Sequence, residues 1–135
     1  MAYDKLIIFS DGGARGNPGP AGAGVVIKSD GEVVDEISKY LGEATNNQAE
    51  YTAILMGLER AKELGAKEVE SVMDSELACK QLNGEYKVKD QELAKIFVKV
   101  WNLTHEFDKV TFRHVKREFN KEADALVNKA IDANT

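Results

Sequence analysis

The sequence has one cysteine, two prolines and no long apolar run. The single cysteine, Cys79, excludes an internal disulfide framework, and its place in the apolar-periodic run 75–82 predicts a buried, unreactive thiol. The apolar run 6–9 near the N-terminus is too short, and too soon followed by Asp11, for a signal peptide or a membrane-spanning helix. We therefore expect a cytoplasmic protein in a reducing compartment, with no membrane association.

Positive charge is also in short supply, because 18 lysines and arginines face 23 aspartates and glutamates, for a formal net charge of −5. This balance argues against a protein that coats nucleic acid through bulk electrostatics, since phosphate neutralisation normally comes from a basic face. Local basic clusters remain among residues 80–99 and 113–121. Such runs are usually solvated faces, so they do not by themselves indicate a binding site.

The hydrophobic periodicity predicts one domain, residues 1–135, built from alternating groups of strands and helices. A buried strand at 5–10 leads into a glycine-rich loop at 11–20, and strands at 23–28 and 32–40 flank Asp30-Gly31, a two-residue hairpin signature. The remaining elements are a helix at 47–64, a strand at 68–73, helices at 75–83 and 90–107, a strand at 109–115 and a last helix capped by Asn120. This order predicts an α/β fold with a mixed sheet, its first three strands antiparallel, covered by helices on both faces.

Four acidic residues are predicted to point toward the body of the protein. Asp11 lies where a buried strand meets the glycine-rich loop, and Asp74 ends another apolar strand directly before a helix. Glu50 and Asp124 fall on the apolar stripes of the first and last helices. Each has an ordinary alternative when taken singly: Asp74 is better explained as a helix cap, and Asp124 as the partner of a lysine.

Taken together, the four acids indicate a metal site of a particular kind. Hard oxygen ligands suit Mg²⁺ or Mn²⁺, whereas a zinc site more often uses cysteine and histidine. Cys79, His105 and His114 show no ligand spacing, and no serine lies on a nucleophile-elbow motif. A nucleotide-phosphate binder is disfavoured, because the glycine-rich loop lacks both the Walker ending and the dinucleotide spacing.

Three segments combine these acids with closely spaced glycines and amides. They are Phe9-Ser-Asp-Gly-Gly-Ala-Arg-Gly-Asn-Pro-Gly19, Thr45-Asn-Asn-Gln-Ala-Glu-Tyr51 and Asp74-Ser-Glu-Leu77. Together they resemble type 1 ribonuclease H. The resemblance extends through residues 81–89 to residues 120–126, so that it covers nearly the whole chain in the family's order. It implies a ribonuclease H-like fold with a five-stranded mixed sheet and helices on both faces.

The resemblance implies an endonuclease that cuts the RNA strand of an RNA/DNA hybrid. A monomer is expected, because nothing in the sequence suggests a large exposed apolar stripe. The family's metal-binding acids fall at Asp11, Glu50, Asp74 and Asp124. They would hold two Mg²⁺ ions, with Mn²⁺ as a substitute, in a two-metal reaction that leaves 5′-phosphate and 3′-hydroxyl ends. The substrate-contacting positions fall at Gly12, Gly13, Asn17, Thr45, Asn46, Asn47, Gln48 and Arg117. Asn17 and the glycines have an alternative as plain turn residues.

Two features depart from many bacterial members of that family. The flexible histidine before the last helix is replaced by Arg117, and His114 in the preceding strand is interpreted as structural. The link 84–90 is too short for the basic handle that grips the hybrid, so we expect weaker hybrid affinity and a shallow salt dependence. The lysines among residues 80–89 would partly replace the handle.

Two other functions are compatible with much of the same pattern. One is a metal nuclease on the same fold that acts on DNA, such as an integrase-like or resolvase-like domain, and the segment 45–47 with the glycine-rich loop argues against it. The other is a non-catalytic module that binds hybrids, and the presence of all four acids argues against that.

Overall fold

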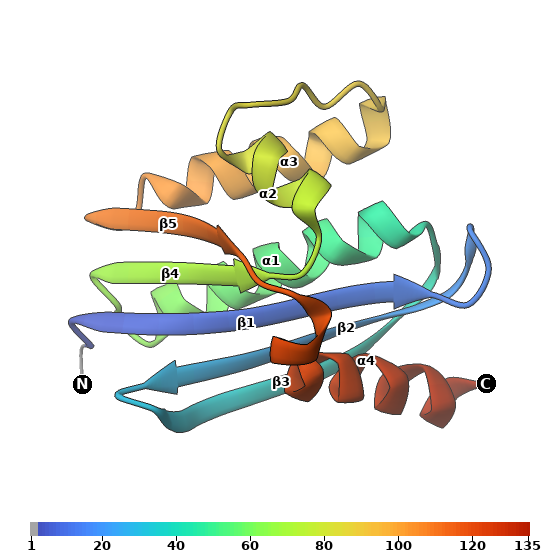
Figure 1. The fold of residues 1–135 in the computed structure, drawn as a ribbon, viewed down its shortest axis with the longest axis horizontal. Coiled ribbons are helices and arrows are strands. Elements are labelled where there is room, and N and C mark those ends of the chain that lie inside the picture. Colours follow the sequence, from blue (N-terminus) through green and yellow to red (C-terminus); the bar gives the residue numbers. More distant parts are fainter. Residues whose placement is uncertain (1–2) are drawn as a thin grey trace.

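The computed structural model describes residues 3–135, which form five strands and four α-helices (Figure 1). The strands are β1 (Lys5–Ala14), β2 (Gly19–Ser29), β3 (Glu32–Ala44), β4 (Glu68–Met73) and β5 (Lys109–His114). The helices are α1 (Asn46–Glu63), α2 (Glu76–Leu82), α3 (Gln91–Thr104) and α4 (Lys121–Asn134), and one turn of 3₁₀-helix at Arg117–Phe119 precedes α4. None of the helices in this part of the chain is long and apolar enough to span a membrane.

The five strands form one mixed sheet in the order β3-β2-β1-β4-β5. β1 pairs antiparallel with β2, and β2 with β3, whereas β4 runs parallel to both β1 and β5. The expected antiparallel meander and mixed sheet are therefore confirmed. The β2–β3 hairpin turns at Asp30 and Gly31, whose φ angles of 50° and 82° are those that a two-residue turn of this kind requires.

Helices cover both faces of the sheet, as the periodicity predicts (Figure 1). α1 packs on β1 and β2 with α3 outside it, and α4 packs across β2 and β3 on the opposite face. The main core lies between α1 and the sheet, where Leu6, Ile8, Ile54 and Leu58 are at most 1% exposed. Each such side chain contributes roughly 1.5–3 kcal/mol through burial, so the position of α1 on β1 is firmly held.

The glycine-rich segment was predicted as a loop from residue 11 to residue 20, and this boundary is wrong. β1 continues through Asp11 to Ala14 and β2 begins at Gly19, so that only residues 15–18 connect them. The glycines are needed for close packing as well as for turning. A Cβ at Gly12 would lie 2.5 Å from the backbone nitrogen of Glu50, and one at Gly24 would meet the Ala123 carbonyl. Helices thus pack directly against the sheet backbone on both faces, at glycines that have no side chain to keep them apart.

The helices begin within one residue of their predicted starts, but not every expected cap and end is found. Thr45 and Gln48 form a capping box at the start of α1, and Ser75 caps α2 by accepting the Ala78 N–H at 3.1 Å. Asn120 stands at the N-cap position of α4, but its side chain makes no capping bond. α3 ends at Thr104, three residues before its predicted end.

The cysteine prediction is confirmed. Cys79 is a free thiol that is 6% exposed, and burial raises its pKa, which disfavours the reactive thiolate.

Candidate functional site

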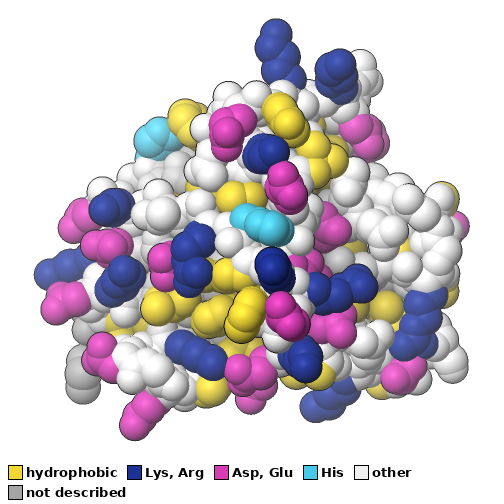
Figure 2. All heavy atoms as spheres, in the orientation of Figure 1, with side chains coloured by type: hydrophobic (Ala, Val, Ile, Leu, Met, Phe, Trp, Pro, Cys, Tyr) yellow, Lys and Arg dark blue, Asp and Glu magenta, His cyan; other side chains and the backbone are white. Residues whose placement is uncertain are grey.

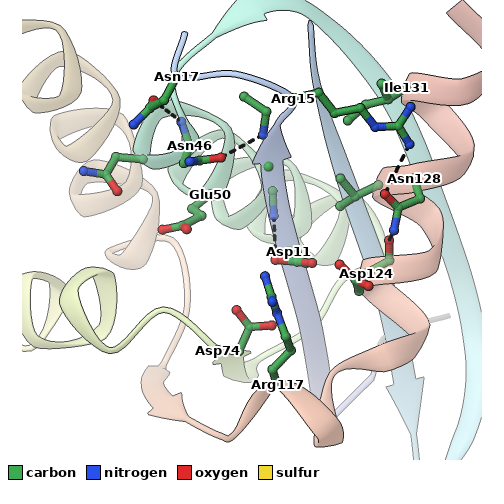
Figure 3. Close-up of a pocket in the computed structure, with 15 residues that line it drawn as sticks. Asp11, Arg15, Asn17, Asn46, Glu50, Asp74, Arg117, Asp124, Asn128 and Ile131 are labelled. Atoms are coloured by element: carbon green, nitrogen blue, oxygen red, sulfur yellow. Dashed lines mark hydrogen bonds between the residues drawn. The ribbon is translucent and has the colours of Figure 1, made fainter. Parts of the chain in front are cut away.

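The four predicted acids line one cavity of about 470 Å³ at the edge of the sheet (Figure 3). Its walls come from β1, α1, α4, the segments that follow β1 and β4, and the 3₁₀ turn before α4. The lining residues are Asp11, Gly12, Gly13, Ala14, Arg15, Asn17, Asn46, Asn47, Glu50, Asp74, Arg117, Asp124, Val127, Asn128 and Ile131. Residues from the first and last tenths of the chain therefore meet at a single site.

Each acid is positioned by the element that carries it. β1 and β4 run parallel, so Asp11 in β1 and Asp74 directly after β4 emerge near the same edge of the sheet. Glu50 follows the capping box in the first turns of α1, and Asp124 lies in the first turn of α4. Because Ser75 caps α2, Asp74 has no capping role, and the capping interpretation of this residue is wrong.

Burial and the neighbouring acids raise the pKa values of Asp11 and Glu50. The pKa of Asp11 is raised from 3.8 to about 8, mainly by burial. The charge of Asp74, a hydrogen bond with Asp124 and the charge of Asp124 add to this rise. The Gly12 N–H, which donates to Asp11 Oδ1 at 3.0 Å, opposes this rise only weakly. Burial also raises the pKa of Glu50. Negative charge is thus concentrated where it is poorly solvated, as at a site that receives a cation.

The polar residues predicted to contact substrate divide into two groups. Asn17, Asn46 and Asn47 line the cavity, and the first two are held in place, since Asn17 Oδ1 accepts the Asn46 N–H at 3.1 Å and Asn46 Oδ1 accepts the Ala14 N–H at 2.8 Å. The side chains of Thr45 and Gln48 bond to each other's backbone in the capping box, and neither residue is part of the cavity lining. Gly12, Gly13 and Arg117, also predicted to contact substrate, line the cavity.

Asn120 is a site residue that the sequence pattern did not reveal. It is 2% exposed, and its amide nitrogen donates to the Ser10 carbonyl at 2.9 Å and to Asp74 Oδ2 at 3.1 Å. It therefore ties β1, the end of β4 and the start of α4 together at the acids. Its position before α4 predicts only a helix cap. Its role at the acids is visible only from the long-range contacts with Ser10 and Asp74.

Comparison with known proteins identifies the family. A family model described as reverse transcriptase-like matches residues 9–130. A ribonuclease H from Pseudomonas fluorescens is 32% identical over 143 aligned residues, which cover 96% of this chain and 93% of that protein. The chain belongs to the ribonuclease H family.

Two further proteins are similar to this chain. LC11-RNase H1, solved in complex with an RNA/DNA hybrid, is 48% identical, with a TM-score of 0.91 over 96% of this chain and 98% of that chain. The bifunctional protein Rv2228c of Mycobacterium tuberculosis is 43% identical over 96% of this chain, which spans only 36% of that protein's length. The resemblance and the fold inferred from the sequence are both confirmed.

The four acids that line the cavity are a set of oxygen ligands that fits hard divalent cations. Within residues 3–135, no three His, Cys, Asp or Glu side chains lie close enough together to hold one ion as they stand. That arrangement is compatible with Mg²⁺, which keeps several waters and usually takes only one or two protein carboxylates together with substrate phosphates. All four acids offer oxygen, and a cation between them would relieve the repulsion that raises the pKa of Asp11.

Proposed function

We propose that this chain is a metal-dependent endonuclease that hydrolyses the RNA strand of RNA/DNA hybrids. The observation that carries the proposal is the single cavity that four carboxylates share with the amide side chains of Asn17, Asn46 and Asn47. Membership of the ribonuclease H family supports this activity, and the hybrid bound to LC11-RNase H1 supports this substrate. We also propose that the chain acts as a monomer.

We propose that Asp11, Glu50, Asp74 and Asp124 hold two Mg²⁺ ions, which Mn²⁺ can replace. Asp11 interacts with both Asp74 and Asp124, which makes it the candidate for a ligand shared between the ions. Glu50 lies within the field of Asp74. When bound, such ions activate the attacking water and stabilise the leaving oxygen. The carboxylates form no covalent bond to the substrate.

The proposed reaction is the hydrolysis of one phosphodiester bond. Water adds its oxygen to the phosphorus, the bond from phosphorus to the 3′ oxygen breaks, and that oxygen gains a proton, leaving 5′-phosphate and 3′-hydroxyl ends. Arg117, whose positive charge partly opposes the rise that burial causes in the pKa of Glu50, lies beside Asp74 and offers a cation to the phosphate (Figure 3). Its guanidinium suits this role because it presents several fixed donors.

Selection of RNA would rest on the 2′-hydroxyl groups in the shallow minor groove. With their oxygens bonded inside the protein, Asn17 and Asn46 retain amide nitrogens that can donate to a 2′-hydroxyl. Gly12 and Gly13 let the backbone approach closely. Thr45 and Gln48 would contribute by holding the start of α1, and with it Asn46 and Asn47, in position.

Cleavage of an RNA/DNA hybrid with label on the RNA tests this proposal. Internal cuts are expected with Mg²⁺ or Mn²⁺ and not with a chelator, and single-stranded RNA and duplex DNA should stay intact. Labelling each RNA end in turn, with phosphatase treatment of the products, identifies the end chemistry. A hybrid that is bound but uncut with both metals would favour the non-catalytic module, and cutting of duplex DNA would favour a DNA nuclease.

Asn120→Ala is expected to lower kcat by roughly 10- to 100-fold and to raise the Mg²⁺ concentration needed for half-maximal activity. The reason is that residues which orient metal ligands typically contribute this much, and the Asn120 amide is a direct partner of Asp74. Metal titrations of the cleavage rate give both quantities. Asn134→Ala is the matched control, since its amide donates to the Ala130 carbonyl at 2.8 Å on the same helix and lines no part of the cavity. An unchanged Mg²⁺ requirement in Asn120→Ala would contradict the positioning role.

A further inference from the structure

Arg15 lines the same cavity and has no part in the function proposed so far. It begins the short β1–β2 connection, and its guanidinium lies on the opposite side of Asp11 from Arg117 (Figure 3). Among the described residues, Arg15 and Arg117 are the positively charged side chains that line the cavity, beside the four carboxylates. Elsewhere on the face shown in Figure 2, basic side chains are interspersed with acidic ones.

The guanidinium of Arg15 is held by one face of α4. Its Nη1 lies 2.7 Å from Asp132 Oδ1, and its Nη2 donates to Asn128 Oδ1 at 3.4 Å. Asn128 Nδ2 in turn donates to the backbone carbonyl of Asp124 at 3.2 Å. Since Asp124, Asn128 and Asp132 recur every four residues, they form a row along α4 that runs from the acids to Arg15.

These contacts aim the arginine without adding much to the stability of the fold. The Arg15 and Asp132 side chains are 46% and 66% exposed, and ion pairs this open are weak. Another anion can therefore displace Asp132 at little cost. A backbone phosphate suits this exchange, because a guanidinium binds phosphate oxygens through two parallel hydrogen bonds.

A nucleic-acid strand whose scissile phosphate lies at the acids must continue past them in both directions. Its neighbouring phosphates then pass over an acidic cavity and need positive charge on each side. Arg117 supplies it on one side of Asp11, and Arg15 is the cation on the other.

We propose that Arg15 binds a non-scissile phosphate of the RNA/DNA hybrid, and that Asp132 is a counter-ion that orients Arg15 and gives way to the phosphate. This inference rests on the proposed function. It makes Arg15 a determinant of affinity, so its loss should raise KM and leave kcat nearly unchanged, because the contact is equally strong before and during the reaction.

Binding of a fluorescently labelled RNA/DNA hybrid, measured by anisotropy, tests the inference. The parent protein carries Asp11→Asn so that the hybrid is not cut. Adding Arg15→Gln is expected to weaken binding about tenfold at about 50 mM salt and to reduce the slope of log K against log salt concentration by about one. Asp132→Asn should tighten binding by up to about fivefold, as expected when a competing ion pair is removed.

Lys28→Gln is the matched control. Lys28 also pairs with an acid of α4, its Nζ lying 2.8 Å from Glu122 Oε1, but it is outside the cavity lining. We expect its hybrid affinity to stay within about twofold of the parent's. Thermal unfolding of each variant checks that the fold is retained.

The outcomes separate this inference from the function beneath it. If Arg15→Gln leaves the affinity and salt slope of a binding-competent parent unchanged, the inference alone is wrong. If Asp132→Asn weakens binding as much as Arg15→Gln, the pair merely fastens the loop to α4, and the phosphate assignment is wrong. If the parent binds no hybrid and the wild type cuts none, the proposed function is overturned and this inference with it.

Discussion

Asp11→Asn is expected to lower the rate of RNA-strand cleavage on the order of a thousandfold while the protein stays folded. Asp11 is the carboxylate that interacts with two of the other three acids, so its loss removes a ligand proposed for both metal ions. Metal ions supply several kcal/mol of transition-state stabilisation, and each 1.4 kcal/mol corresponds to a factor of ten in rate. Single-turnover cleavage of a labelled hybrid with saturating Mg²⁺ measures the change.

The same substitution should stabilise the metal-free protein at high pH. The pKa of Asp11 is about 8 in the folded protein against an ordinary value of 3.8, so the folded state binds the proton more tightly. Its contribution to stability is therefore full below about pH 4 and is lost as the pH rises through 8. Asn, which does not titrate, avoids that loss. In a chelator, the stability of Asp11→Asn relative to wild type should rise between these limits by up to a few kcal/mol.

In Mg²⁺ the wild type should instead become more stable than Asp11→Asn. The reason is that Mg²⁺ binds the deprotonated wild-type site and stabilises the folded state by mass action. We expect the melting temperature of the wild type to rise with Mg²⁺, and to rise more at pH 8 than at pH 6, while that of Asp11→Asn changes little. Asp108→Asn, at an exposed position outside the cavity, is the control for loss of one negative charge. An equal Mg²⁺ response in wild type and Asp11→Asn would remove Asp11 from the metal site.

Local patterns predicted most of the elements and the convergence of the acids. Asp11 and Asp74 follow from strands that end at one edge, and Glu50 follows from a capping box and a 3.6-residue stripe. Strand ends, helix caps and helical stripes are all set by residues within a few positions of one another, so they can be recognised in the sequence. The ambiguity at Asp74 was also local, and it is resolved by Ser75, the residue that caps α2.

The residues that escaped prediction owe their roles to distant partners. Asn120 meets Ser10 across 110 positions of sequence, and Arg15 meets Asn128 across 113. Both residues lie in segments that carry the family resemblance, but no local pattern indicates these contacts, because each partner is brought near only when α4 packs on the sheet. The predicted end of β1 is wrong for a related reason. Its glycines allow close packing against helices that lie far along the chain.

Gly12→Ala is expected to destabilise the protein by about 3 kcal/mol and to reduce cleavage at least tenfold in the molecules that remain folded. Overpacking costs of this size arise when neither neighbour can move aside. The new Cβ would meet the carbonyl of Ala49 and lie 2.5 Å from the backbone nitrogen of Glu50, and backbone in a buried helix cannot rotate away as a side chain can. Urea unfolding measures the first effect and single-turnover cleavage the second.

Gly13→Ala is the matched control one residue along. A Cβ there would have Val127 Cγ1 as its nearest neighbour, at an ordinary 3.8 Å. Where the backbone accepts it, replacing glycine by alanine stabilises by about 0.4–1 kcal/mol through the unfolded chain. Gly13→Ala should therefore unfold at the same or a slightly higher urea concentration than wild type. Equal stability of the two variants would mean that α1 and β1 are less tightly apposed than the structure indicates.

The activity loss in Gly12→Ala has a cause separate from its stability loss. To accommodate the methyl group, the start of α1 must move outward from β1, and Glu50 moves with it, away from Asp11. Misplacement of a catalytic group by about 1 Å can cost a hundredfold in rate. Cleavage measured well below the melting temperature should thus remain impaired, with a raised Mg²⁺ requirement. Full activity at low temperature would instead mean that the glycine serves stability alone, and that the site tolerates movement of α1.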